Sequence, residues 1–455
     1  MKILILGAGQ VGTTAAYSLA REEANEVTIV DLDRDVLREL QDRLDVRTVV
    51  GNAAHPDVLA RAGAKEADMI IALTDSDEVN MVACQVAYSL FRTPRRIARI
   101  RAREFTSRPE LFAEGELAVD VAVSPEALVT AHIEELIHHP GALQVLAFAS
   151  DAVRLVATRA LTGGALIGRP LRELSKHIPN VECRVVAIYR GTRGIIPDGD
   201  VVVEAGDEVF FIASRKDVRT VLSEMRKLDD PVRRVVIAGG GNIGLRLATA
   251  LEQTNQVKII ERDFQRARAI SERLHRAIVL HGDAADEELL LEENIDSADV
   301  FVAVTDAEEA NILSAMLAKR LGAHKVMALI NKPAYAELIE AGTIDIAISP
   351  QQITLGSLLA HVRRGDVVKV HSLRRGAAEA IEAIAHGKAE DSRVVGRTVE
   401  QIELPRGAAI NAIVRGQDVL MAHHDTRVEE DDHVILFLSD RRQIDQVERL
   451  FEVEA

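Results

Sequence analysis

The stretch Gly7-Ala8-Gly9-Gln10-Val11-Gly12 follows the apolar run Lys2–Leu6 and precedes an apolar helical pattern. In such a strand-to-helix junction, the first glycine permits a tight turn and the second lets a pyrophosphate approach the backbone. The third glycine allows close packing of the helix on the strand. Asp31 follows Gly12 by 19 residues, at the end of the next predicted strand, where a carboxylate binds ribose hydroxyls. The stretch therefore predicts a Rossmann-like sheet with a dinucleotide at the start of its first helix.

The same arrangement occurs a second time in the chain. Gly239-Gly240-Gly241-Asn242-Ile243-Gly244 lies 232 residues further on, and Glu261 takes the place of Asp31. Further matches are Gly51-Asn52 with Gly282-Asp283, Thr74-Asp75 with Thr305-Asp306, Asn80 with Asn311, Ser124-Pro125 with Ser349-Pro350, and Ala187–Gly191 with Ala412–Gly416. The whole chain is therefore interpreted as two copies of one pair of modules.

Short β-branched runs alternate with helical patterns in each copy, which predicts βαβ units and a parallel sheet. For copy one we expect strands at residues 2–6, 26–30, 47–50, 69–73, 96–101 and 119–123, and a helix at 125–137. From about residue 142 the pattern predicts a small α+β module with strands at 153–157, 185–188, 201–203 and 208–212 and a helix at 216–228. In copy two we expect strands at 234–238, 412–414 and 433–438, and a final module that starts near residue 369.

The fold class is thus α/β, with two Rossmann-like doubly wound domains that are each followed by a small α+β C-terminal module. We predict domain boundaries at residues 1–140, 141–230, 231–366 and 367–455. The segment Asp229-Asp230-Pro231 makes a natural break between the two copies.

Composition narrows the class of protein further. The 455 residues are 47% hydrophobic and 28% charged, which are ordinary values for a globular chain. The net charge of −16 opposes binding to duplex nucleic acid or an anionic lipid surface. Two cysteines exclude a disulfide framework and suit a reducing compartment. No signal-peptide pattern and no 18-residue uncharged stretch occurs in the sequence, so a cytoplasmic location is expected.

The glycine turns identify the candidate ligand. Asp31 and Glu261 would accept hydrogen bonds from two ribose hydroxyls and would repel a 2′-phosphate, which favours NAD(H) or an adenine nucleotide over NADP(H). The candidate contacts are Gly7, Ala8, Gly9, Gln10, Val11, Gly12 and Asp31 in copy one, and Gly239, Gly240, Gly241, Asn242, Ile243, Gly244 and Glu261 in copy two. The alternative is a glycine turn that only packs the sheet.

Polar residues also follow other strands at the same edge, where open α/β sheets bind ligands. These candidates are Asn52, Thr74 and Asp75 in copy one and Asp283 and Thr305 in copy two. An alternative role is helix capping, with Asp75 or Ser76 as the cap of the following helix.

Two arginines distinguish copy one from copy two. Alternation along the expected strand would direct Arg99 and Arg101 to one face, where guanidinium groups bind phosphate oxygens. Leu329 and Asn331 occupy the matching positions in copy two. The alternative is an ion-pair cluster with surrounding acids. The pairs His138-His139 and His423-His424 lack the spacing of metal ligands, and no metal site is expected.

At this point the sequence resembles the regulator of potassium conductance family. The resemblance rests on the Gly7–Gly12 motif with Asp31, the segment Thr74–Asn80, the arginines near residue 99 and the small β-rich module. It covers nearly the whole chain, and the tandem arrangement is similar to that of the peripheral NAD-binding regulatory subunits of Trk potassium uptake systems.

This resemblance implies a function without catalysis. The family implies a cytoplasmic protein that lies against the inner face of the membrane through a channel or transporter subunit of the Trk type. It also implies a homo-oligomeric gating ring, with a tetramer expected, whose shape NAD(H), ATP or ADP resets. The departures at Leu329 and Asn331 put phosphate-rich ligands at the second site in doubt.

Two other classes use the same glycine turn or a similar regulatory logic. An NAD-dependent oxidoreductase would need a proton donor beside the nicotinamide, and the β-rich modules carry no evident His or Tyr/Lys constellation. A redox-sensing transcriptional repressor would need a basic helix-turn-helix segment, and none stands out. The sequence therefore favours a regulatory subunit over an enzyme.

Overall fold

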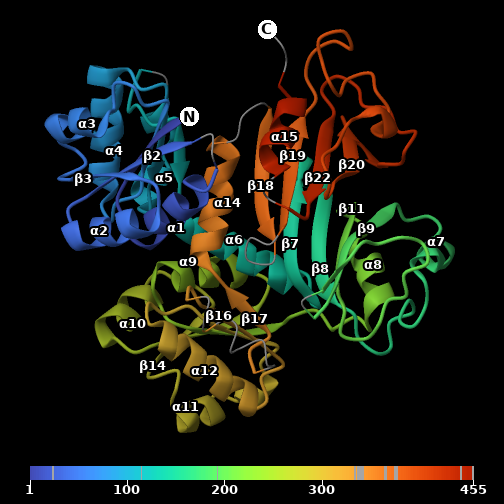
Figure 1. Ribbon diagram of the computed structural model, residues 1–455. Helices are drawn as coiled ribbons and strands as arrows, with labels where there is room; N and C mark the ends of the chain where they lie inside the picture. Colours follow the sequence, from blue (N-terminus) through green and yellow to red (C-terminus); the bar gives the residue numbers. More distant parts are fainter. Residues whose placement is uncertain are drawn as a thin grey trace. The chain divides into compact units, whose positions relative to one another are not determined.

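The computed structural model describes residues 1–22, 25–113, 115–191, 193–332, 335, 343–362, 366–373, 378–440 and 443–452. These residues form two parallel six-stranded sheets and two antiparallel five-stranded sheets, alternating along the chain. The predicted fold class is thereby confirmed. The chain divides into two compact units, one of residues 1–128 with 350–358 and one of residues 129–349 with 359–455 (Figure 1).

The first parallel sheet has the strand order β3-β2-β1-β4-β5-β6. The chain adds β2 and β3 on one side of β1 and β4 to β6 on its other side, as in a doubly wound fold. Its elements are β1 (Lys2–Leu6), α1 (Gln10–Leu19), β2 (Glu26–Asp31), α2 (Arg34–Arg43), β3 (Arg47–Val50), α3 (Pro56–Ala62), β4 (Met69–Ala72), α4 (Asp77–Val86), β5 (Arg95–Arg99), α5 (Arg103–Thr106), β6 (Val121–Val123) and α6 (Pro125–His138). Ile3 to Leu6 are all buried, because helices cover both faces of a central parallel strand.

The largest differences from the expected strands of the first sheet lie at β5 and β6. Strand β5 ends at Arg99, so Arg101 lies beyond the strand and the alternation argument does not apply to it. The cause is a contact distant in sequence, since Asp77, 24 residues before Arg101, accepts hydrogen bonds from the amides of Arg101 and Ala102 and diverts the chain from the sheet. Strand β6 begins at Val121 and not at Val119.

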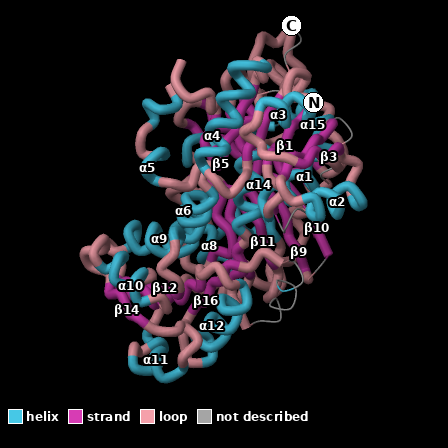
Figure 2. Tube along the Cα trace, turned by 90° about the vertical axis from the view of Figure 1, so that its left-hand side faces the viewer, coloured by secondary structure: helices cyan, strands magenta, loops and turns pink. Residues whose placement is uncertain are grey.

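The second parallel sheet repeats the first, with the strand order β14-β13-β12-β15-β16-β17. Its elements are β12 (Arg234–Ala238), α9 (Asn242–Leu251), β13 (Gln256–Glu261), α10 (Phe264–Ser271), β14 (Ile278–His281), α11 (Glu287–Glu292), β15 (Val300–Ala303), α12 (Glu308–Arg320), β16 (Lys325–Leu329), β17 (Ile346–Ile348) and α14 (Pro350–Val362). Figure 2 shows β12, β14 and β16 among the helices α10, α11 and α12 of this copy.

The small modules also repeat each other. The first contains β7 (Ala142–Phe148), β8 (Val153–Arg159), α7 (Leu174–His177), β9 (Cys183–Arg190), β10 (Arg193–Ile195), β11 (Glu208–Ser214) and α8 (Val218–Met225). The second contains β18 (Val367–Leu373), β19 (Ala378–Ile384), β20 (Ala408–Arg415), β21 (Asp418–Met421), β22 (His433–Leu438) and α15 (Ile444–Leu450). The prediction of a strand at residues 201–203 is wrong, because Val202 and Val203 form only isolated bridges, to Pro170 and Ile167 respectively.

The two antiparallel sheets share one hydrophobic core. Phe148 and Phe210 of the first module belong to the same buried cluster as Ile435 and Phe437 of the second, and Figure 1 draws β18 and β22 beside β7 and β8. A buried hydrogen bond of 2.9 Å joins the Ala149 amide to the Glu382 carboxylate. Each module therefore buries its apolar face against the other copy.

A buried aspartate closes one loop in each small module. Asp207 is 1% exposed and receives two hydrogen bonds from the Arg190 guanidinium, at 2.8 and 2.9 Å. Asp432 is fully buried and receives the same pair from Arg415, both at 2.8 Å. Burial raises the pKa of Asp207, but the bonds from Arg190 and the Glu204 amide outweigh it and hold this pKa below its usual range.

We predict that Asp207→Asn lowers the free energy of unfolding by about 1.5–3 kcal/mol, because it replaces charge-assisted hydrogen bonds by weaker ones. The contribution of Asp207 is complete above the unfolded pKa of about 4 and is lost as the pH falls through the lower native value. The free energies of unfolding of wild type and variant, measured by denaturation, should therefore converge at acid pH. Glu204→Gln, at an exposed carboxylate that also pairs with Arg190, is the matched control with a smaller effect. An equal loss in both variants would contradict this account.

No helix of the described residues is both long and apolar enough to cross a lipid bilayer.

Candidate functional site

The first glycine turn connects β1 to α1 with little room for side chains. Gly7 has a φ of 101°, which L side chains rarely adopt, and its amide donates to the Val30 carbonyl at 2.8 Å. A Cβ on Gly12 would overlap the carbonyl oxygen of Gly7. A Cβ on Gly9 would meet no atom of the described chain within 4 Å. The backbone is thus open at Gly9, where the helix begins and its amides can bind a phosphate.

Asp31 fixes this turn from the end of β2. One carboxylate oxygen accepts the Ala8 amide at 2.5 Å, and the other accepts the Asp33 amide at 2.8 Å. The side chain is half-buried and keeps lone pairs for further donors. The predicted ribose acid and the predicted glycine turn therefore lie in direct contact.

The second glycine turn has the same construction between β12 and α9. Gly239 has a φ of 105°, and a Cβ on Gly244 would overlap the Gly239 carbonyl oxygen. Glu261 accepts the Gly240 amide at 2.7 Å and the Asp263 amide at 2.8 Å. Asn242 and Ile243 begin α9, as Gln10 and Val11 begin α1. The candidate residues of each copy are therefore brought together in the same way.

Arg266 adds a contact that only the second turn has. Its Nε donates to the Gly240 carbonyl at 2.8 Å, whereas Val36 occupies the matching position in copy one. Sequence reasoning missed this residue, although the offset of 230 between Asp31 and Glu261 would have paired it with Val36.

In the first unit, helix α14 contacts the first glycine turn. The Thr14 hydroxyl donates to the side-chain oxygen of Gln351 at 3.0 Å, and the Gln351 amide donates to Gln10 at 3.3 Å. Gln351 lies in the first turn of α14, after the last strand of the second sheet. A helix that enters from the second copy thus meets a candidate nucleotide contact of the first.

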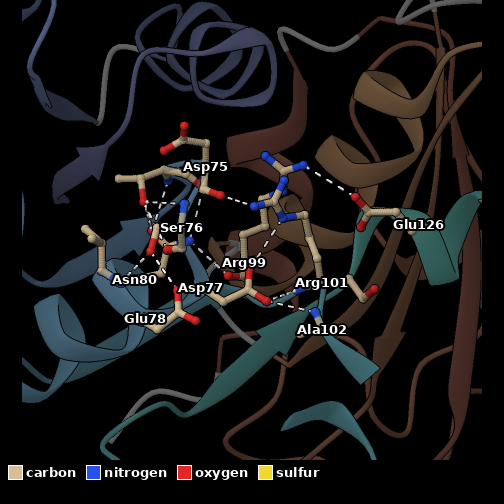
Figure 3. A network of polar contacts seen from close by, with 12 residues as sticks. Asp75, Ser76, Asp77, Glu78, Asn80, Arg99, Arg101, Ala102 and Glu126 are labelled. Atoms are coloured by element: carbon tan, nitrogen blue, oxygen red, sulfur yellow. Dashed lines mark hydrogen bonds and ion pairs between the residues drawn. The ribbon is translucent and has the colours of Figure 1, made fainter. Parts of the chain in front are cut away.

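The ends of β4 and β5 are joined by a buried asparagine. Asn80 is fully buried, accepts the Thr74 amide and hydroxyl at 3.0 and 2.7 Å, and donates to the carbonyls of Thr74 and Arg99 (Figure 3). Asn311 makes the same four contacts with Thr305 and Leu329. Thr74 and Thr305 are thereby fixed at the carboxyl edge, beside the glycine turns in strand order.

Several of the remaining candidates take local roles in the structure. Ser76, and not Asp75, caps α4 by accepting the Val79 amide at 3.2 Å, while Asp75 is exposed. Asn52 accepts the Ala54 amide at 2.9 Å in the turn before α3. Asp283 accepts the Ala285 amide at the same distance in copy two. A role of Asn52, Asp75 or Asp283 in ligand binding stays a prediction.

Both candidate arginines lie against acids, as in the ion-pair alternative. Arg101 pairs with Asp77 at 3.5 Å and also donates to the Asp75 carbonyl, and Arg99 pairs with Glu126 at 3.6 Å (Figure 3). Burial lowers the pKa of Arg99, although the nearby Glu126 carboxylate opposes this effect. Their role as phosphate ligands stays a prediction.

Copy two keeps the acid that accepts two backbone amides, but its nearby cation pairs with the next residue of α12. Glu308 accepts the amides of Asn331 and Lys332 at 2.7 and 2.8 Å, as Asp77 does with Arg101 and Ala102. Lys332 pairs with Glu309 at 3.0 Å, which raises the pKa of the lysine. Sequence reasoning missed this cation, because it lies one residue beyond the position that matches Arg101.

No group of three His, Cys, Asp or Glu side chains in the described part of the chain has the geometry to hold a metal ion.

We predict that Gly12→Ala lowers the free energy of unfolding by about 1–3 kcal/mol, the usual cost of inserting a methyl group into packed space. Gly9→Ala is the matched control and should leave the melting temperature unchanged, since its Cβ points into open space. Thermal unfolding of both variants tests the turn geometry. Equal melting temperatures for Gly12→Ala and wild type would show that α1 does not approach β1 as closely as described.

Comparison with known families agrees with the repeat. The TrkA-N domain model matches residues 3–125 and 235–350, and the TrkA-C domain model matches residues 156–226 and 388–452. The two models thus alternate along the chain, and each matches twice.

Curated relatives match along their whole length. The Trk system potassium uptake protein TrkA of Halomonas elongata is 60% identical and that of Vibrio alginolyticus 56%, over 99% or more of this chain and 99% of each relative. The corresponding protein of Haemophilus influenzae is 48% identical over 100% of this chain. These names describe proteins of a transport system, in agreement with the prediction of a protein that is not an enzyme.

Solved structures show the same fold at low identity. The GsuK RCK domain matches with a TM-score of 0.62 and 18% identity over 99% of this chain and 94% of that one. A structure described as the GsuK channel bound to NAD matches with the same score and identity, over 98% of this chain and 79% of that one. The chain therefore shares its fold with the GsuK RCK domain, and its tandem TrkA-N and TrkA-C domains and its curated relatives show that it belongs to the TrkA family of the Trk potassium uptake system.

Proposed function

We propose that this chain is a cytoplasmic, nucleotide-binding subunit that gates a Trk-type potassium uptake channel at the inner face of the membrane. NAD(H), ATP or ADP would change the conformation of a ring of several copies, with a tetramer expected. The observation that carries the proposal is the glycine turn fixed by a carboxylate, present twice. The relatives named for potassium uptake supply the transport process.

The residues fit NAD(H) at each turn. The open backbone at Gly9 and Gly241 leaves space for a pyrophosphate beside the start of a helix. Asp31 and Glu261 each bond two backbone amides and retain lone pairs that would accept ribose hydroxyls. When bound, NAD(H) supplies a pyrophosphate, two riboses and an adenine, and regulation requires no hydride transfer.

Regulation requires that the ligand bind two conformations of the ring with different affinity, and a coupling of about 1–3 kcal/mol is typical. Gln10 offers one route for this coupling, because it contacts both the helix start and Gln351 of α14. A phosphate beside Gln10 would compete for its side chain and change the contact with α14. In this conformational change, the units that move would be the four predicted domains, 1–140, 141–230, 231–366 and 367–455.

We predict that Asp31→Ala weakens NADH binding by about 1–3 kcal/mol, the usual loss for charge-assisted hydrogen bonds. Glu261→Ala should weaken the second site similarly, and the double variant should lose both. Calorimetry with NADH, NAD, ATP and ADP measures this, with Asp35→Ala, an exposed acid on the neighbouring helix, as the charge-matched control. Unchanged NADH affinity in a variant with a wild-type melting curve would exclude Asp31 as a ribose ligand.

We further propose that ligands with a free triphosphate prefer the first site. Arg99 and Arg101 lie at the carboxyl edge of the first sheet, where copy two has Leu329 and Asn331. On this proposal, phosphate oxygens would replace the Glu126 and Asp77 carboxylates as partners of the two guanidinium groups.

We predict that Arg99→Ala and Arg101→Ala each weaken ATP binding at the first site by about 1.5–3 kcal/mol and affect NADH less. Arg103→Ala removes a neighbouring exposed arginine and should change neither. Titration of ATP and NADH into the full chain, with Glu261→Ala to isolate the first site, provides the test. Loss of the oligomer without loss of ATP affinity would instead assign Arg99 and Arg101 to assembly.

A further inference from the structure

A cavity of about 900 Å³ lies at the other edge of the second parallel sheet. The first residues of β12, β13 and β14 line it, together with the loops at residues 252–255 and 293–298. Parallel strands begin at one edge of a sheet and end at the other, so the cavity lies at the edge opposite to the Gly239 turn. The glycine turn and the residues of the proposed nucleotide site take no part in it.

Three arginines line this cavity. In the part of the chain that the structure describes, the guanidinium groups of Arg233 and Arg234 have no hydrogen-bond or ion-pair partner, and Arg276 makes one long bond, of 3.4 Å, to the Gln253 carbonyl. Asp299 accepts the backbone amides of Arg233 and Arg234 at 2.7 and 2.9 Å, which fixes their Cα positions. The cavity therefore carries cationic groups whose hydrogen-bond donors are largely unused.

The carboxylates of the cavity are mostly committed to other partners. Glu252 is 4% exposed and accepts three backbone amides, from His275, Arg276 and Ala277, at 2.8 to 3.2 Å. Glu293 pairs with the Lys258 ammonium at 2.7 Å. Asp296 is the remaining carboxylate of the lining. The lining holds three arginines and Lys258 against the carboxylates of Glu252, Glu293 and Asp296, which leaves an excess of one positive charge in a chain whose net charge is −16.

The first copy does not repeat this feature. By strand register, Met1 and Lys2 stand where copy two has Arg233 and Arg234, and Asp45 stands where it has Arg276. The glycine turns and the buried asparagines keep the same backbone contacts in both copies. The three arginines are not needed to form such a sheet, because the first sheet forms without them.

We propose that this cavity binds a soluble, phosphate-bearing polyanion, at a site separate from the glycine turns. Guanidinium groups bind phosphate oxygens through paired, charge-assisted hydrogen bonds. The volume lies within the range of small-molecule sites, and the buried residues Val235, Val236 and Val257 are part of the lining. A regulatory subunit with this cavity responds to a second class of signal besides the nucleotide at the carboxyl edge.

The test uses inorganic tripolyphosphate as the probe and the full chain as the receptor. Calorimetric titration is made with excess NAD present, so that a signal that persists belongs to a site NAD does not occupy. The triple variant Arg233→Gln/Arg234→Gln/Arg276→Gln should weaken binding at least about tenfold for each guanidinium that contacts the anion. Arg273→Gln, an exposed arginine outside the lining, is the matched control and should bind as wild type does.

Three outcomes would overturn the proposal: no binding of tripolyphosphate to wild type, equal binding to the triple variant, or complete displacement of the anion by NAD. Binding of the chain to phosphatidylglycerol vesicles without binding of tripolyphosphate would overturn it too, because the ligand would then be a lipid headgroup. NADH affinity and the melting temperature of the triple variant are measured in parallel and should match wild type. Failure of NADH to bind anywhere would count against the proposed function and leave this site standing.

Discussion

The contact between the start of α1 and the turn after β1 is the constraint on which the proposed site depends. Only a glycine at position 12 lets the helix lie against the Gly7 carbonyl, and the Asp31 carboxylate then fixes the turn through the Ala8 amide. The same three elements occur at Gly244, Gly239 and Glu261. The packing of the first helix on the first strand of each sheet therefore also places the helix amides and a carboxylate at the carboxyl edge. The fold and the candidate site thus depend on the same contact.

Duplication extends this constraint from one sheet to the whole chain. The small antiparallel sheets bury their apolar faces against each other in one core, so neither module completes its core within its own copy. Helix α14 continues from the second sheet and contributes Gln351 beside Gln10 of the first unit. One continuous helix, α14, thus follows the last strand of the second sheet and contacts the glycine turn of the first.

Sequence reasoning predicted the features that follow from local rules. Glycine spacing, an acid at the next strand end and alternating strand and helix patterns together predicted two doubly wound sheets and a glycine turn at the first strand-to-helix junction of each. It failed where distant groups decide. Strand β5 stops at Arg99 because Asp77, on a preceding helix, accepts the Arg101 amide. Buried Asn80 donates to the Arg99 carbonyl, 19 residues away in the chain. The role of Arg266 likewise depends on its contact with the Gly240 carbonyl, 26 residues away.

The central claim is that nucleotide binding at the two carboxylate-fixed turns controls potassium transport. The most direct measurement is potassium flux into vesicles that contain a Trk-type transporter together with this chain, with and without NADH. We expect NADH to change the flux through the wild-type complex, and the double variant Asp31→Ala/Glu261→Ala to need a concentration at least tenfold higher for the same change. A flux that NADH does not alter, or that it alters equally in wild type and double variant, would contradict the account.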